Sequence, residues 1–136
     1  DPRSVVDTET GDTLLHRACA NGAKRIVKLC LRKGLKLGVR NHKKETCLHA
    51  VATTNTPFLG KDQLADYLLS KGVRIDSRDK EGKTALMQAA VRGLTALVTC
   101  LVEFADLEIK DLEGNTALHL ALLEEEYQVV RILLDA

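Results

Sequence analysis

Three of the four histidines in the sequence occupy equivalent places, and histidine is a common metal ligand and proton carrier near neutral pH. His16, His49 and His119 each follow a threonine by three residues. A ligand set or a catalytic pair needs side chains that meet at one point. The regular recurrence of these histidines instead indicates one structural hydrogen bond repeated along the chain, so we expect no metal and no cofactor.

The four cysteines could in principle form disulfides or bind zinc. They contain no C-x-x-C pair and no short Cys/His cluster of the kind that holds zinc. They lie among apolar residues, where a free thiol behaves as a small hydrophobe. We therefore expect reduced thiols and a reducing compartment, the cytoplasm or the nucleus. The residues concerned are Cys19, Cys30, Cys47 and Cys100.

The sequence carries none of the short motifs of common catalytic chemistry. It has no G-x-S-x-G, no P-loop, no H-E-x-x-H and no dinucleotide fingerprint. The carboxylates of 124–126 have no partner carboxylate at a fixed spacing, which is typical of a solvated turn. No apolar run approaches the roughly 20 residues of a membrane span, and no signal peptide opens the chain. We expect a protein that is not an enzyme, with no small-molecule substrate and no transmembrane segment.

A short segment recurs four times and organises the chain. In each copy a turn precedes a threonine that can cap a helix, and apolar residues follow three and four positions apart on one helical face. The threonines are separated by 33, 38 and 32 residues. The copies are TETGDTLLHRAC (8–19), NHKKETCLHAVA (41–52), DKEGKTALMQAA (79–90) and DLEGNTALHLA (111–121), with Thr13, Thr46, Thr84 and Thr116 as the threonines.

A period of about 33 residues, with a turn followed by T-x-L-H, resembles the ankyrin repeat. The resemblance covers nearly the whole chain. It implies an all-α solenoid of helix-turn-helix units, with β-hairpin-like finger loops, in a single domain over residues 1–136. The expected repeats are about 8–40, 41–78 with an insertion near 56–61, 79–110 and 111–136. The apolar final helix differs from the polar outer face of a terminal repeat, so we expect a fragment of a longer protein.

The same resemblance assigns structural roles to single residues. It implies that the recurring histidines bond to the turn backbone and tie one repeat to the next, with Met87 as the exception at that position. Lys44 occupies a glycine position, which requires either a positive φ or a different turn. Asp62 is expected to be the N-cap of the second helix of repeat two.

Ankyrin proteins bind partners on a concave side lined by finger tips and by the ends of the first helices. On this chain the resemblance places the basic residues of the centre beside apolar ones, a mixture that suits an extended peptide with acidic residues and one or two apolar anchors. The candidate partner-binding residues are His42, Lys43, Glu45, Lys80, Glu81, Lys83, Leu112 and Asn115 on the fingers, and Thr53, Thr54, Val91, Arg92 and Leu123 at helix ends.

The net charge of +1 hides an asymmetry between the two halves. Residues 1–72 hold 13 Lys/Arg and 7 Asp/Glu, whereas residues 73–136 hold 7 and 12. Basic residues concentrate between Lys24 and Lys36, which leaves phosphate binding by that face, to nucleic acid or phosphoinositide, as one alternative. No aromatic residue is interleaved there to stack on bases, so nucleic acid is the less expected ligand.

Three functions therefore remain open at this stage. The leading hypothesis is a protein–protein interaction module within a larger regulatory or scaffolding protein. The second is a structural spacer that positions a neighbouring domain, and the third is the phosphate-binding face.

Overall fold

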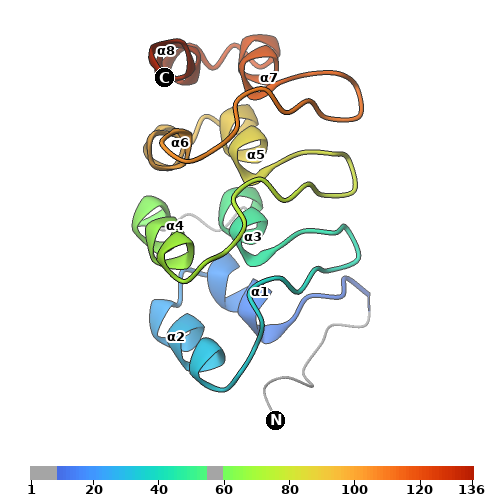
Figure 1. Cartoon of the computed structure of the whole chain (residues 1–136), viewed down its shortest axis with the longest axis vertical. Coiled ribbons are helices and arrows are strands. Elements are labelled where there is room, and N and C mark those ends of the chain that lie inside the picture. Colours follow the sequence, from blue (N-terminus) through green and yellow to red (C-terminus); the bar gives the residue numbers. More distant parts are fainter. Residues whose placement is uncertain (1–8, 55–59) are drawn as a thin grey trace.

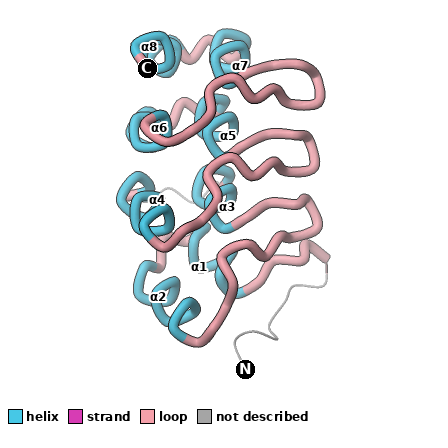
Figure 2. The backbone as a smooth tube through the Cα atoms, viewed as in Figure 1, coloured by secondary structure: helices cyan, strands magenta, loops and turns pink. Residues whose placement is uncertain are grey.

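The helices occur in pairs and account for the regular structure of the chain. The computed structural model describes residues 9–54 and 60–136. No strand is present within these two ranges, and the fingers are loops (Figure 2). The described helices are α1 (Leu14–Ala20), α2 (Lys24–Arg32), α3 (Cys47–Thr53), α4 (Lys61–Ser70), α5 (Ala85–Val91), α6 (Thr95–Val102), α7 (Ala117–Leu123) and α8 (Tyr127–Asp135). The predicted all-α fold is confirmed.

The helix pairs stack along one axis (Figure 1). The first helices α1, α3, α5 and α7 form one column in which each helix contacts the next, and α4, α6 and α8 do the same in a second column. The loops that join one pair to the next project from the first-helix column as a row of fingers (Figure 1). The predicted solenoid is therefore confirmed as well.

The recurring threonine starts the first helix of a repeat. The hydroxyls of Thr13, Thr84 and Thr116 accept the backbone N–H of the residue three positions later. In α1 the bond is reciprocal, because the Thr13 N–H donates to Nδ1 of His16 at 3.1 Å. Each helix of this kind has only seven residues, so its stability comes from packing and capping more than from intrinsic helix propensity.

The core is a continuous layer of small and medium aliphatic residues between the two columns. Leu48 and Leu86 of the first helices are about 1% exposed, and Leu68 of α4 is fully buried. Ala89 and Ala90 are also fully buried, and their small size allows the neighbouring helices to approach closely. Because each repeat completes the burial of the next, no single repeat holds a separate core.

The structure tests the expected turn at Lys44 and the expected N-cap at Asp62. Lys44 adopts φ 61°, so the first of the two alternatives for its turn is confirmed. The N-cap expectation for Asp62 was wrong, because Gly60, at φ 89°, caps α4 and Lys61 is its first residue. Asp62 lies in the first turn instead, where its carboxylate faces the positive end of the helix dipole. Residues 55–59 of the expected insertion lie outside the described residues.

Candidate partner-binding surface

An acidic or amide side chain closes the second, third and fourth fingers. In the third finger, Oδ1 of Asp79 accepts the backbone N–H groups of Glu81 and Lys83, both at 2.9 Å. Asn41 and Asp111 make the same pair of bonds in their own fingers. Sequence analysis missed these three residues, although each stands five positions before a recurring threonine.

Backbone hydrogen bonds join each finger to its neighbour. The tips therefore form a rigid row, and a partner that binds them does not have to order a flexible loop. The bonds run from the N–H of one tip to the carbonyl of the preceding one: His42 to Thr10 at 2.8 Å, Lys80 to Lys43 at 2.8 Å and Leu112 to Glu81 at 3.0 Å.

The recurring histidines tie the fingers to the first helices. Nδ1 of His49 accepts the Thr46 N–H at 3.1 Å, so the proton of a neutral ring is on Nε2, which donates to the Lys83 carbonyl at 2.9 Å. His16 bonds in the same way to the carbonyl of Glu45. The expectation of a bond that connects successive repeats is confirmed for these two histidines.

Acidification is expected to weaken the native state through His49. Burial lowers the pKa of His49, and the Lys83 carbonyl and Asp79 offset this only partly. The unfolded chain therefore binds a proton near its ordinary pKa of 6.5, before the folded chain does. Stability is complete above that value and falls below it, by up to about 1.4 kcal/mol per pH unit. Urea unfolding between pH 7 and pH 5 should show this slope, and His49→Gln should flatten it.

The predicted partner-binding residues divide into two groups in the structure. Seven of them are exposed and can contact a partner without rearrangement: His42, Lys43, Lys80, Glu81, Arg92, Leu112 and Leu123. Six are partly buried: Glu45, Thr53, Thr54, Lys83, Val91 and Asn115.

Some of the predicted basic partner-binding residues already make contacts within the protein. The Lys83 side chain is only 15% exposed, and its Nζ lies 3.5 Å from a carboxylate oxygen of Glu81 and 3.5 Å from Oδ2 of Asp111. Arg92 donates to the side-chain oxygen of Gln88 at 2.5 Å. His42 bonds to the carbonyl of Glu9 at 3.1 Å.

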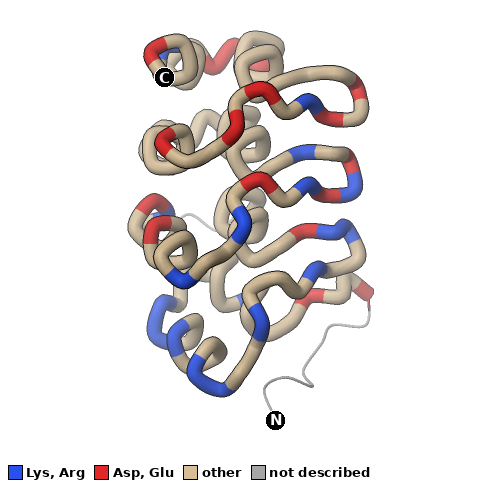
Figure 3. Tube along the Cα trace, in the orientation of Figure 1, with Lys and Arg blue, Asp and Glu red and all other residues tan. Residues whose placement is uncertain are grey.

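Among the predicted basic partner-binding residues, Lys43 and Lys80 carry positive charge at the finger tips. Lys43 and Lys80 belong to successive fingers, are exposed and are joined through their backbones. Figure 3 shows basic and acidic residues together on the second and third fingers and mostly acidic residues on the fourth. The row of fingers therefore becomes more acidic toward the fourth repeat.

Two leucines on the fourth repeat are mostly exposed to solvent. Leu112 at the finger tip is 74% exposed, and Leu123 at the end of α7 is 69% exposed. Both were predicted as partner contacts. Leu112 supplies apolar surface next to the tip of the third finger, to which its backbone bonds, and Leu123 supplies it at the far end of α7.

The basic outer helix α2 has an aromatic neighbour that sequence analysis did not find. The Nζ atoms of Lys24 and Lys28 lie 5.6 and 5.4 Å from the ring centre of Tyr67 on α4, and that of Lys71 lies 5.5 Å away. These distances fit cation–π contacts. Some of the basic face is therefore engaged with the next repeat.

No metal-binding cluster and no membrane-spanning helix occur in the part of the chain that the structure describes. No group of three or more His, Cys, Asp or Glu side chains there could hold an ion, and no helix is long and apolar enough to cross a bilayer. All four cysteines are free thiols, three of them buried and Cys100 half-buried. Burial raises the pKa of the Cys30 and Cys100 thiols, which keeps them protonated and slow to react.

The stacked pairs and joined fingers define a helical-repeat solenoid. A family model described as ankyrin repeats (3 copies) matches residues 57–136, and one described as ankyrin repeat matches residues 10–39. The chain belongs to the ankyrin-repeat family and is a protein–protein interaction module.

Curated relatives cover most of this chain. NF-kappa-B inhibitor delta of Mus musculus is 36% identical over 125 residues, which are 88% of this chain and 37% of that protein. B-cell lymphoma 3 protein of Homo sapiens is 30% identical over 136 residues, 93% of this chain and 29% of the relative. Transient receptor potential cation channel subfamily A member 1 of Drosophila melanogaster is 32% identical over 117 residues, which are 82% of this chain and 9% of that protein. The chain thus spans well under half the length of these relatives.

Proposed function

We propose that this chain recognises a partner protein through its finger tips and the ends of its first helices, without catalysis. The observation that carries the proposal is the exposure of Leu112, in a row of tips held rigid by backbone bonds, and of Leu123 at the end of α7. Burying a leucine side chain contributes about 1.5–3 kcal/mol. Two such anchors could supply a large part of the binding free energy, since a few residues usually carry most of it.

The chemistry of the surface favours a partner segment with acidic residues followed by apolar ones. The acidic residues would meet Lys43 and Lys80, and the apolar ones would meet the two leucines. Because the name of the delta relative says that it inhibits NF-kappa-B, NF-kappa-B is the first partner to test. The free thiols support a reducing compartment, the cytoplasm or the nucleus.

Truncation of both leucines is expected to weaken partner binding about tenfold or more, since each loses roughly 1 kcal/mol of apolar contact. The variant is Leu112→Ala/Leu123→Ala, and the measurement is titration calorimetry with purified NF-kappa-B. Stability should change little, because both side chains are already exposed. Leu134→Ala is the matched control, because Leu134 is 66% exposed on the outer helix α8.

Comparison with Leu134→Ala shows whether a loss of affinity is specific to Leu112 and Leu123. Equal loss in Leu134→Ala and in the double variant would contradict the proposed surface, as would unchanged affinity in both. If wild-type chain binds no NF-kappa-B, the same variants are applied to partners captured from lysate. Failure to recover any specific partner would favour the structural spacer.

The basic outer face supports a second candidate, the binding of phosphorylated lipid headgroups. The specific observation is the cluster of Lys24, Lys28 and Lys71 around Tyr67, which concentrates positive charge on one face of the stack. Binding to phosphoinositide vesicles should weaken steeply as salt rises if this face carries it. Absence of vesicle binding at low salt would remove this candidate.

A further inference from the structure

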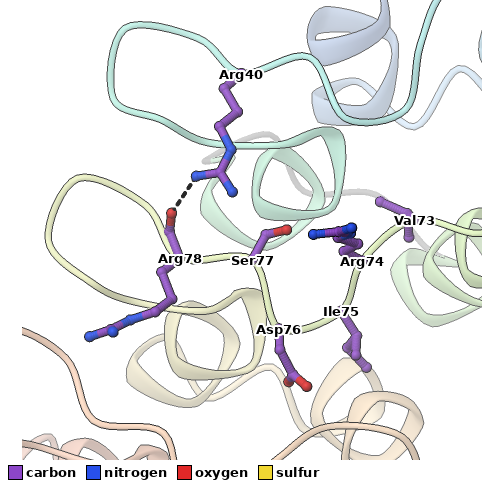
Figure 4. Close-up of a pocket in the computed structure, with 7 residues that line it drawn as sticks. All are labelled: Arg40, Val73, Arg74, Ile75, Asp76, Ser77 and Arg78. Atoms are coloured by element: carbon purple, nitrogen blue, oxygen red, sulfur yellow. Dashed lines mark hydrogen bonds between the residues drawn. The ribbon is translucent and has the colours of Figure 1, made fainter.

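A groove lies between the end of the first repeat and the end of the second, away from the partner-contact residues at the finger tips. It has a volume of about 690 Å³, and the loop 73–78, which follows α4, forms most of its wall together with Arg40 (Figure 4). An adjoining hollow of about 390 Å³ shares Arg40, Arg74 and Ser77 and extends toward Gly72. The two hollows together form one depression that a chain segment can enter.

Two arginines stabilise the wall of this groove. Nη1 of Arg40 donates to the carbonyl of Arg78 at 2.7 Å and to that of Lys44 at 3.4 Å. Arg78 in turn donates to the carbonyls of Gly82 and Lys110. Arg40 uses only one of its nitrogens in these bonds, so its remaining N–H groups can serve a ligand. Because Nη1 bonds to two backbone carbonyls, the guanidinium of Arg40 is held in place before any ligand binds.

Two further donors in the groove have no partner. Neither the guanidinium of Arg74 nor the hydroxyl of Ser77 makes a hydrogen bond to another residue of the described chain. Figure 4 shows the Arg74 side chain directed toward Ser77, with Arg40 above the same loop. The single carboxylate of the wall, Asp76, accepts the Asp106 N–H at 3.0 Å and points away from Arg74 and Ser77 (Figure 4). The free donors thus come together without a neutralising acid.

We propose that this groove binds a phosphate group carried by a segment of a partner protein, as phosphoserine or phosphothreonine. A phosphorylated side chain has a charge of about −1.5 to −2 at pH 7 and three acceptor oxygens. The positive charges of Arg40 and Arg74 match that charge, and the Ser77 hydroxyl supplies a third donor. A carboxylate is planar and is satisfied by one guanidinium, so it would leave part of the set unused. The groove is much larger than a phosphate group, which leaves room for flanking residues.

The test measures binding of fluorescein-labelled peptide libraries by fluorescence anisotropy. The libraries are random except for a central phosphoserine, serine or glutamate. Wild-type chain should bind the phosphoserine library about tenfold more tightly than the glutamate library, and the serine library least. Arg74→Gln should lower affinity for the phosphoserine library about tenfold, the loss expected for one charge-assisted hydrogen bond. Asp76→Asn removes the negative charge but keeps an acceptor for the Asp106 N–H, so it should raise the affinity for the phosphoserine library.

The controls separate this groove from the rest of the surface. Arg131→Gln removes an exposed arginine of α8 and should leave affinity unchanged. Equal binding by wild type and Arg74→Gln would overturn the proposal, as would equal binding of the glutamate library. Inorganic phosphate that binds as tightly as the peptides would point to a free anion and overturn it too. Loss only in Lys24→Gln/Lys28→Gln would place the phosphate at Tyr67, and the proposed function at the finger tips would be unaffected by any of these results.

Discussion

Gly82→Ala is expected to lower the free energy of unfolding by about 3 kcal/mol. Gly82 has φ 79°, and a Cβ built there would lie 2.9 Å from the backbone nitrogen of Leu112 in the next finger. The left-handed conformation alone costs a residue with a Cβ roughly 1–2 kcal/mol. The clash adds to this, because the Leu112 N–H that would be displaced bonds to the Glu81 carbonyl at 3.0 Å. Urea unfolding monitored by circular dichroism measures the total loss.

Gly114→Ala provides the matched comparison for this variant. Gly114 holds the same position in the fourth finger with φ 83°, and a Cβ there would meet nothing within 4 Å. Gly114→Ala should therefore lower the free energy of unfolding only by the conformational cost, about 1 kcal/mol. The difference between the two variants isolates the contact between successive fingers. Equal losses would mean that the fingers do not support one another, contrary to the hydrogen bonds between them.

The repeated features of the fold could be predicted because four copies of one segment stand in the sequence. The capping role of the threonines follows from their positions in that segment, and the glycine position of Lys44 limited its turn to two alternatives, one of them the observed positive φ. The N-cap of α4 could not be predicted in this way, because the insertion displaces it from the pattern and Gly60 takes the place expected for Asp62. Local rules succeed where the repeat is regular and fail where it is interrupted.

The candidate surface could be predicted only in part, because contacts between repeats decide which charges remain available. Exposure of Leu112 and Leu123 agrees with their expected place at a finger tip and a helix end. The engagement of Lys83 with Asp111 could not be foreseen, because the two residues come from different repeats and meet only when the fingers stack. The groove at Arg40 and Arg74 was missed for the same reason. It forms only when two repeats stack.

His49→Leu is expected to cost about 3 kcal/mol, because it removes the partner of a buried backbone N–H and a hydrogen bond between repeats. Thr46, whose N–H bonds to Nδ1, is 2% exposed, and a buried group left without a partner costs roughly 1–3 kcal/mol. The Lys83 carbonyl keeps the Asp79 N–H at 2.8 Å, so losing the Nε2 donor costs only the net worth of one hydrogen bond, about 1 kcal/mol. Leucine fills a similar volume, so most of the loss reflects the hydrogen bonds. Urea unfolding at pH 7, where the histidine is neutral, measures it.

The same substitution at His119 separates the role of stacking from that of capping. His119 is exposed, and its Nδ1 accepts the Thr116 N–H at 3.3 Å. After His119→Leu, water can reach Thr116, so we expect the loss of a helix cap alone, about 1 kcal/mol. A loss at His49 no larger than at His119 would mean that the bond to the next finger contributes nothing. A larger loss at His49 would show that one side chain stabilises two repeats, which is how a stack of units without separate cores unfolds cooperatively.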